Sequence, residues 1–263
     1  MGPPVVDGWG LGLAASLLCI NAGLSLWLRL GLERALGVAA LRAAVQLSLL
    51  AMVLEPVFSI AHPAAVVGLV LVMVLLAGRE AARRTSRSYA GMGWVTLVAM
   101  GGGAGLTAVI GTGWILRADP WWEPRYLIPF VGMILGNTLT GVSLGLDTVL
   151  RALDEQRSTV ELRMALGASP WEACRPLVAD ATRTGMLPIV NAMSVAGLVT
   201  IPGMMTGQLL GGSSPSVAAR YQVLILFLIT AAVGVGVGVA VITTLRLLFD
   251  ARWRLRLERL THR

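Results

Sequence analysis

The chain has 263 residues, of which 56% are apolar and only 13% charged, and its mean hydropathy is +0.77. A soluble domain of this size would carry about 25% charged residues to solvate its surface, so these values exclude a soluble globular protein. The net charge of +7 rests on 21 basic residues, and all of them are arginine. They fall in short groups between apolar runs, which is typical of membrane topology and not of a nucleic-acid-binding surface.

Seven apolar windows are long enough to cross a bilayer, since about 30 Å of hydrocarbon takes around 20 helical residues. In chain order they cover residues 9–28, 35–54, 61–78, 92–116, 126–150, 184–210 and 222–249. The windows that end near 116 and 210 are rich in glycine and proline, so a broken or re-entrant helix is an alternative there. The sequence therefore predicts an all-α, polytopic membrane bundle of about seven transmembrane helices in a single domain, residues 1–263.

The arginines also predict an orientation, because cytoplasmic loops carry an excess of basic residues. With seven crossings, most of the arginines fall on the side of the C-terminus, and the other side holds only Arg117, Arg125 and Arg220. We therefore expect an N-terminus outside and a C-terminus in the cytoplasm, in the inner (plasma) membrane. The basic, amphipathic tail 252–259 is expected to lie on the anionic cytoplasmic leaflet.

One predicted loop, residues 151–183, is much longer than the others. Residues 154–166 have a helical pattern, and Gly167 ends it as a C-cap glycine would. Ser169 then fits the N-cap of a second helix, with Pro170 at its first position and Glu172 completing a capping box. We therefore expect two short helices that meet at a glycine corner and project from the cytoplasmic side.

The six-residue spacing from Glu161 to Gly167 resembles the Glu-Ala-Ala…Gly loop of ABC-transporter permeases. In those proteins the loop forms a coupling helix that sits in a cleft of the ATPase subunit. The match is partial, because Leu162 and Arg163 replace the two alanines, and on this spacing alone a plain surface hairpin is an equal alternative. The residues to which the resemblance assigns ATPase coupling are Glu161, Arg163, Gly167, Ala168, Ser169, Pro170 and Trp171.

Further segments extend the resemblance over nearly the whole chain. Residues 132–138, 161–170 and 197–207, the last with a Pro-Gly-Met-Met run, resemble the FetB family, as do Arg42 and Gln46. That family comprises iron-export ABC permeases and related plant aluminium-tolerance permeases. The resemblance implies export of iron or another metal ion, and a nucleotide sugar stays open as a substrate. Some relatives have a lysine near Ser194, and its absence here leaves the substrate in question.

The chain has no ATP-hydrolysing motif of its own. A P-loop needs a lysine to hold the β- and γ-phosphates, and this sequence contains no lysine. We therefore expect a protein that is not an enzyme and binds no cofactor itself, with ATP and Mg²⁺ held by a separate FetA-like ATPase subunit in two copies. One helix set per chain predicts a homodimer around a symmetric pathway. The other expected partner is membrane lipid, and no nucleic acid is expected.

Polar residues inside membrane helices are costly and therefore mark candidate pathway positions. The candidates are Arg42, Gln46, Asn137, Thr140, Asp147, Asn191, Ser194, Met204 and Met205. For the window 126–150, close helix packing through small residues at four-residue spacing is the alternative. Asp147 is the first candidate partner of the Arg42 guanidinium, which otherwise snorkels to the interface. The two histidines, His62 and His262, lie near or outside the membrane edges, and the sequence predicts no confident metal site.

Two rival functions stay open at this point. A secondary transporter driven by an ion gradient would need acidic or histidine relays within its helices, and Asp147 is the only clear residue of that kind. A membrane scaffold that recruits a soluble partner through the long loop would instead tolerate apolar residues on the polar helix faces.

Overall fold

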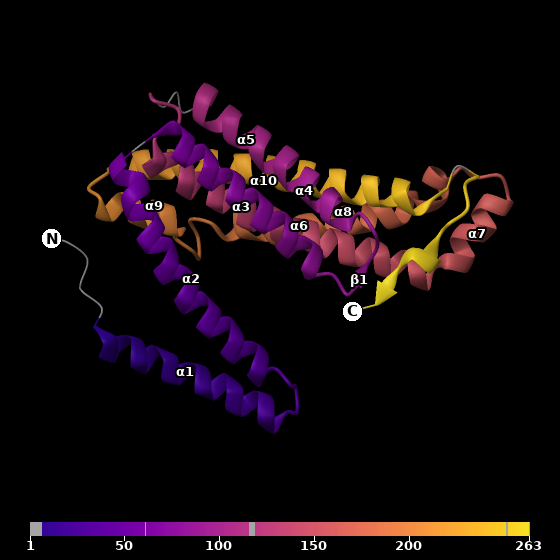
Figure 1. Ribbon diagram of the computed structural model, residues 1–263, viewed down its shortest axis with the longest axis horizontal. Coiled ribbons are helices and arrows are strands. Elements are labelled where there is room, and N and C mark those ends of the chain that lie inside the picture. Colours follow the sequence, from indigo (N-terminus) through magenta and orange to yellow (C-terminus); the bar gives the residue numbers. More distant parts are fainter. Residues whose placement is uncertain (1–6, 61, 116–118, 251, 263) are drawn as a thin grey trace. The chain divides into compact units, whose positions relative to one another are not determined.

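The computed structural model describes residues 7–60, 62–115, 119–250 and 252–262. Helices make up most of this part of the chain (Figure 1), and its two strands, β1 (Arg87–Ser88) and β2 (Thr261–His262), are two residues long each. The chain forms two compact units, Met1–Ala61 and His62–Arg263. The predicted all-α membrane bundle is confirmed, and its organisation as a single domain stays a prediction.

The first unit is a hairpin of α1 (Gly8–Trp27) and α2 (Glu33–Ile60). The Ser25 hydroxyl fixes its corner, because it donates to the Glu33 carboxylate at 2.8 Å and accepts from the N–H of Leu32 at 2.9 Å. Gly31 in the turn has a φ of +68°, a conformation that favours glycine. Both helices are apolar and largely exposed within this unit, so lipid or other protein must surround them.

The second unit contains the remaining helices. They are α3 (Pro63–Arg83), α4 (Met92–Met100), α5 (Leu106–Val109), α6 (Pro124–Glu155), α7 (Arg157–Ala165), α8 (Pro170–Val195), α9 (Gly203–Leu210), α10 (Pro215–Leu248) and the 3-10 turn η3 (Leu257–Arg259). The π-helical segment Gly101–Gly105 joins α4 to α5, and a second one, Ile110–Ile115, follows α5, so that one helical run extends from 92 to 115. Within the described residues this run is continuous, so the glycines there widen the helix and do not break it.

Close backbone approaches at glycine hold α6, α8 and α10 together. A Cβ atom added to Gly141 would lie 2.8 Å from the carbonyl oxygen of Gly185, and one added to Gly185 would lie 2.7 Å from that of Gly141. In α10, a Cβ on Gly236 would lie 2.6 Å from the Thr138 methyl group. The small-residue packing expected of the 126–150 window is thus confirmed at Gly141, whereas Gly136 faces open space.

The predicted membrane helix 184–210 is wrong as a single helix. Helix α8 already begins at Pro170 and ends at Val195, and α9 follows after a turn in which Gly197 has a φ of +79°. The broken helix that the glycine and proline content left open for this window is therefore real, with the break at residues 196–202, and the second helix of the corner is long, not short. The reason is that the capping box starts α8 well before its apolar half.

Six helices of the described residues are long and apolar enough to cross a membrane, and α8 is not among them. The count of seven crossings and the orientation of the termini therefore stay predictions. Four positions used in those predictions, Arg117, Arg263 and the helix ends at 61 and 116, lie outside the described residues.

The C-terminal tail is folded onto the second unit. Strand β2 pairs antiparallel with β1, and Leu255 and Leu257 are buried. Arg259 donates to the carbonyl oxygen of Leu247 at 3.4 Å. Protein therefore covers the leucines that would form the apolar face of an amphipathic tail, and the placement of the tail on the lipid leaflet stays a prediction.

Candidate functional site

The corner between α7 and α8 is built by two capping motifs. The N–H of Ala168 donates to the carbonyl oxygen of Arg163 at 3.1 Å and that of Gly167 to Met164 at 3.0 Å, which is a Schellman ending of α7. Gly167 has a φ of +97°, as that ending requires. The predicted capping box at Ser169 is present and starts α8. The glycine corner between two capped helices that was predicted from the sequence is therefore confirmed.

The residues of this corner divide into those that build it and those that face outward. Arg163 belongs to the first group, because its guanidinium donates to the carbonyl oxygen of Ala173 at 3.1 Å and so ties α7 to α8. Glu161 belongs to the second and forms a 2.8 Å ion pair with Arg157, in which both side chains are half exposed. The outward-facing large apolar side chains are Leu162, Leu166 and Trp171, and Leu166 is 80% exposed.

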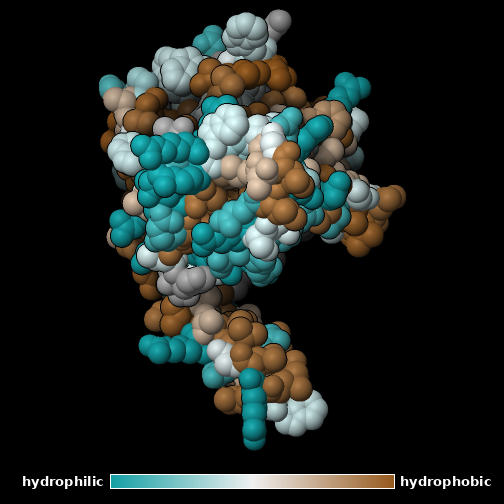
Figure 2. All heavy atoms as spheres, turned by 90° about the vertical axis from the view of Figure 1, so that its right-hand side faces the viewer, coloured by the Kyte–Doolittle hydropathy of each residue, from teal (hydrophilic) through white to brown (hydrophobic). Residues whose placement is uncertain are grey.

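The C-terminal tail lies beside this corner, and two hollows connect them. One hollow, of about 440 Å³, is lined by Arg157, Glu161 and Met164 of α7 and by residues 253–256 and 258 of the tail. The other, of about 560 Å³, joins Ser169, Pro170 and Trp171 to the end of α10 and to Trp253. Figure 2 faces this end of the second unit and shows hydrophilic side chains gathered there.

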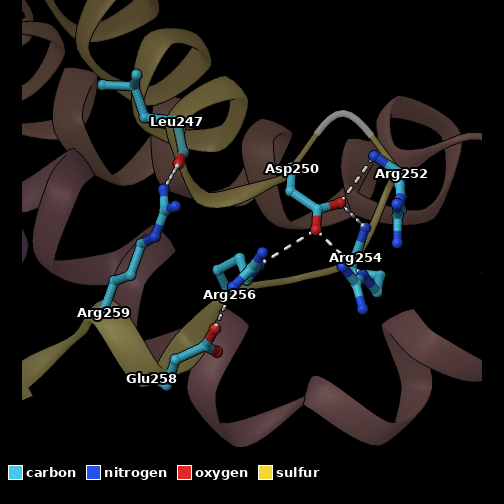
Figure 3. A network of polar contacts seen from close by, with 7 residues as sticks. All are labelled: Leu247, Asp250, Arg252, Arg254, Arg256, Glu258 and Arg259. Atoms are coloured by element: carbon cyan, nitrogen blue, oxygen red, sulfur yellow. Dashed lines mark hydrogen bonds and ion pairs between the residues drawn. The ribbon is translucent and has the colours of Figure 1, made fainter.

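Asp250 holds the tail in its turn (Figure 3). Its carboxylate accepts the backbone N–H groups of Arg252 and Arg254 at 2.9 Å each, and the Nε atoms of Arg254 and Arg256 at 3.1 and 3.2 Å. The hydrogen bond from the Arg254 N–H is the main cause that lowers the pKa of the Asp250 carboxyl to about 2. Such a carboxyl stabilises the fold above its ordinary pKa, and this contribution is lost as the pH falls towards 2.

A second candidate region is one face of α6. Asn137, Thr140, Leu144 and Asp147 lie within an arc of about 80° on that helix, since each residue turns it by about 100°. All four are exposed or half exposed within the second unit. The Asn137 amide and the Thr140 hydroxyl bind only backbone oxygens of their own helix, those of Met133 and Gly136. This face is therefore polar, about 15 Å long and free to meet another surface.

Asp147 fastens this face to the connection that follows α3. Its carboxylate accepts the backbone N–H of Ser86 at 2.8 Å and the Ser86 hydroxyl at 2.6 Å, and it pairs with Arg151. A hollow of about 420 Å³ brings Asp147 and Thr140 together with Arg84, which sequence reasoning did not single out. Arg42, its predicted partner, lies in the first unit together with Gln46, and that pairing stays a prediction.

The other pathway candidates lie on α8 and α9. Helices α6 and α8 are antiparallel, because Gly141 meets Gly185 and Gly145 meets Ala181, and this register places Asn191 and Ser194 beyond the level of Asn137. Met204 and Met205 are half buried in α9. Among the described residues, no group of three or more His, Cys, Asp or Glu side chains is placed to hold a metal ion.

Cys174 in α8 reports on whether the inner side of the corner is packed. The thiol is buried, and burial raises its pKa to about 11. Because only the thiolate reacts, we expect a maleimide at pH 8 to label it about a hundredfold more slowly than an ordinary thiol. The measurement is the mass increase of a Cys19→Ser variant with time, and unfolding in detergent should restore fast labelling. Fast labelling of the native protein would contradict the packing described here.

The tail is the part of this site that sequence reasoning missed. Trp253, Asp250 and Glu258 stand next to the corner although they are about 90 residues away from it in the sequence. A local signal was present in Asp250, since an aspartate that ends an apolar helix before a run of arginines is a typical turn residue. The partner of that turn could not be read from the sequence.

Comparison with known proteins identifies the family of the chain. Residues 8–249 match the uncharacterised protein family UPF0014. The chain is 36% identical over 227 residues to the UPF0014 membrane protein slr1647 of Synechocystis, with 84% of each chain covered. It is 28% identical over 246 residues to the Escherichia coli protein named "Probable iron export permease protein FetB", with 93% of each covered. No solved structure matches.

The chain is also similar to a plant protein. Over 185 residues the chain is 30% identical to Protein ALUMINUM SENSITIVE 3 of Arabidopsis thaliana, with 70% of this chain and 66% of that protein covered. The resemblance read from the sequence motifs is thereby confirmed, and the six apolar helices agree with a multi-pass membrane protein. The chain belongs to the UPF0014 family of membrane proteins.

Proposed function

We propose that the chain is the membrane permease subunit of an ABC transporter that exports iron or another metal ion across the inner membrane. The observation that carries this proposal is the corner between α7 and α8. It is capped on both sides of Gly167, and it presents Glu161, Leu166 and Trp171 outward next to a polar, arginine-rich surface. Large apolar side chains exposed on such a surface mark a protein interaction site. A separate ATPase subunit is the partner that an ABC permease needs there.

The exposed polar face of α6 supports a homodimer. Asn137 and Thr140 lie on a membrane helix and bind only backbone oxygens of that helix, so lipid against this face would leave their remaining hydrogen-bonding groups, such as the Asn137 amide oxygen, without partners. A second copy related by a two-fold axis would cover this face with its own equivalent and enclose a polar pathway between them. The metal cargo rests on the name of the Escherichia coli relative, which says iron export.

Purification of the tagged chain from its native membrane tests the proposal. We expect a P-loop ATPase to be retained with it in equal amount, identified by sequencing and by photolabelling with an ATP analogue. Inverted vesicles that contain both proteins should then take up iron into their lumen only when ATP is present outside. Iron movement driven by a proton or sodium gradient in the absence of the ATPase would contradict the proposal and favour a secondary transporter.

The corner glycine gives a sharper test of coupling. Gly167→Ala places a side chain at a φ of +97°, which costs about 1–2 kcal/mol and shifts the corner. We expect this variant to insert normally and to lose most of the ATPase activity that transport stimulates. Glu161→Ala should reduce the same activity without affecting stability, because the Glu161 carboxylate is half exposed.

Gly91→Ala is the matched control for this experiment. Gly91 has a φ of +96°, and like Gly167 it has open space where a Cβ would stand, but it precedes α4. Both variants should therefore lose similar stability, and only the Gly167 variant should lose coupling. Equal loss of coupling in the two would show that backbone strain, and not the corner itself, is responsible.

A further inference from the structure

Trp253 is the most unusual residue of the C-terminal tail. It is 58% exposed and has a φ of +60°, a left-handed conformation that is rare for a bulky residue. Its side chain contributes to both hollows beside the corner, the one lined by Glu161 and the one lined by Ser169 and Trp171. The Trp253 indole therefore lies between the tail and both helices of the corner.

The Asp250 turn holds Trp253 in this strained position. The N–H groups before and after it, those of Arg252 and Arg254, both bind the Asp250 carboxylate at 2.9 Å. The N–H of Trp253 itself donates to the carbonyl oxygen of Asp250 at 2.9 Å. Backbone strain held in place by surrounding bonds is found at functional positions more often than elsewhere.

The surroundings of Trp253 indicate what covers it. Arg252 and Arg254 flank it and are exposed, and Arg157 lies across the smaller hollow from it. An apolar centre with an arginine rim fits a protein surface that has an apolar pocket bordered by carboxylates. Tryptophan and arginine are also the residues most enriched among those that dominate the binding energy of interfaces.

We infer that Trp253 anchors the ATPase subunit, so that the docking surface consists of the α7–α8 corner together with the C-terminal tail. This inference rests on the proposed function, and it adds a second contact to the coupling corner. The tail is also tied to β1, the strand that follows α3. A movement of the ATPase at this surface would therefore be transmitted to α3 as well as to α6 and α8.

Photo-crosslinking at three positions tests the inference separately from the proposed function. A benzophenone side chain replaces Trp253 in the tail, Leu166 at the corner or Trp94 of α4, the last as a control that is 73% exposed. We expect adducts with the co-purified P-loop ATPase from positions 253 and 166 and none from 94. An adduct from 166 alone would overturn the role of the tail and leave the proposed function intact. No adduct from either position would overturn both, and lipid adducts from 253 would assign the indole to the membrane surface.

Substitution of Trp253 separates anchoring from folding. Trp253→Gly removes the indole and also relieves the left-handed strain, so the purified chain should be at least as stable as the native protein. We expect its affinity for the ATPase to fall by about tenfold or more, and Trp253→Phe to restore most of it. Unchanged affinity in the glycine variant would overturn the inference. So would a glycine variant that loses thermal stability and affinity together.

Discussion

Gly185→Val is expected to prevent the chain from reaching a stable folded state. The Cβ atom alone would stand 2.7 Å from the carbonyl oxygen of Gly141 and 2.9 and 3.0 Å from the two methyl groups of Val237. The first of these contacts is with backbone, which cannot rotate away, so α6 and α8 would have to separate. Overpacking of a tight core costs about 1–3 kcal/mol, and a clash with backbone lies at or above the upper end. The measurement is the fraction of monodisperse protein after detergent extraction, together with its thermal midpoint.

Gly238→Val provides the control for this prediction. Gly238 is in α10, the helix that contributes Val237 to the same contact, and a Cβ added there meets nothing within 4 Å. Replacing a helical glycine with a residue of better helix propensity should leave stability unchanged or raise it slightly. Similar behaviour of the two variants would show that α6, α8 and α10 are not packed at glycine as described.

The glycines also show how far sequence reasoning reaches in this chain. The four-residue spacing of small residues in the 126–150 window correctly indicated a close approach of helices. It did not indicate which glycines take part. A Cβ atom added to Gly141 would clash with the backbone of α8, whereas one added to Gly136 would meet nothing within 4 Å. Spacing defines a face of one helix, but the helix that packs on it lies elsewhere in the chain. The register between α6 and α8 therefore had to come from the structure.

Local signals were reliable where a few neighbouring residues decide the conformation. The Ser169 capping box and the Gly167 ending were both predicted and are both present, because their hydrogen bonds join residues three to five positions apart. The length of α8 was missed for a related reason. Its first turns carry Glu172, Arg175 and Asp180, and because of this polar composition a short helix was predicted there, separate from the apolar window that begins at 184.

What the tail packs against could not be predicted, because the residues that cover it are far away in the sequence. Its alternation of arginine and leucine is amphipathic, as predicted, but amphipathicity does not say what covers the apolar side. In the structure, protein covers Leu255 and Leu257, and strand β2 pairs with a segment 173 residues earlier, as the Ser88 to Thr261 hydroxyl contact shows. Contacts of such long sequence separation leave no local pattern. The corner of the candidate site could therefore be predicted from the sequence, whereas the position of the tail beside it became apparent only in the structure.

The double substitution Asn137→Leu with Thr140→Val is expected to abolish most transport while leaving the protein folded. Both side chains bind only their own helix, at 2.8 and 3.1 Å, so their loss removes no contact between elements of the second unit. If the α6 face lines the pathway, a passing cation loses two groups that replace part of its water shell. Each such bond is worth about 1–3 kcal/mol in a buried setting. That corresponds to a loss of about 5- to 150-fold in rate per group.

Iron uptake into inverted vesicles that contain the ATPase measures this effect, with thermal stability and subunit association measured in parallel. Ser16→Ala is the control, because the Ser16 hydroxyl also binds only its own helix, at 2.7 Å, and lies on α1 among residues with no assigned role. The result distinguishes three functions of the α6 face. If the face lines a transport pathway, the double variant loses iron uptake and keeps subunit association. If the face only joins two copies, the variant loses association first. A scaffold tolerates the change in both respects, because a leucine and a valine are good neighbours for lipid and for packed helices alike. The polarity of this one helix face is therefore the feature that distinguishes a conducting permease from a membrane anchor for a soluble partner.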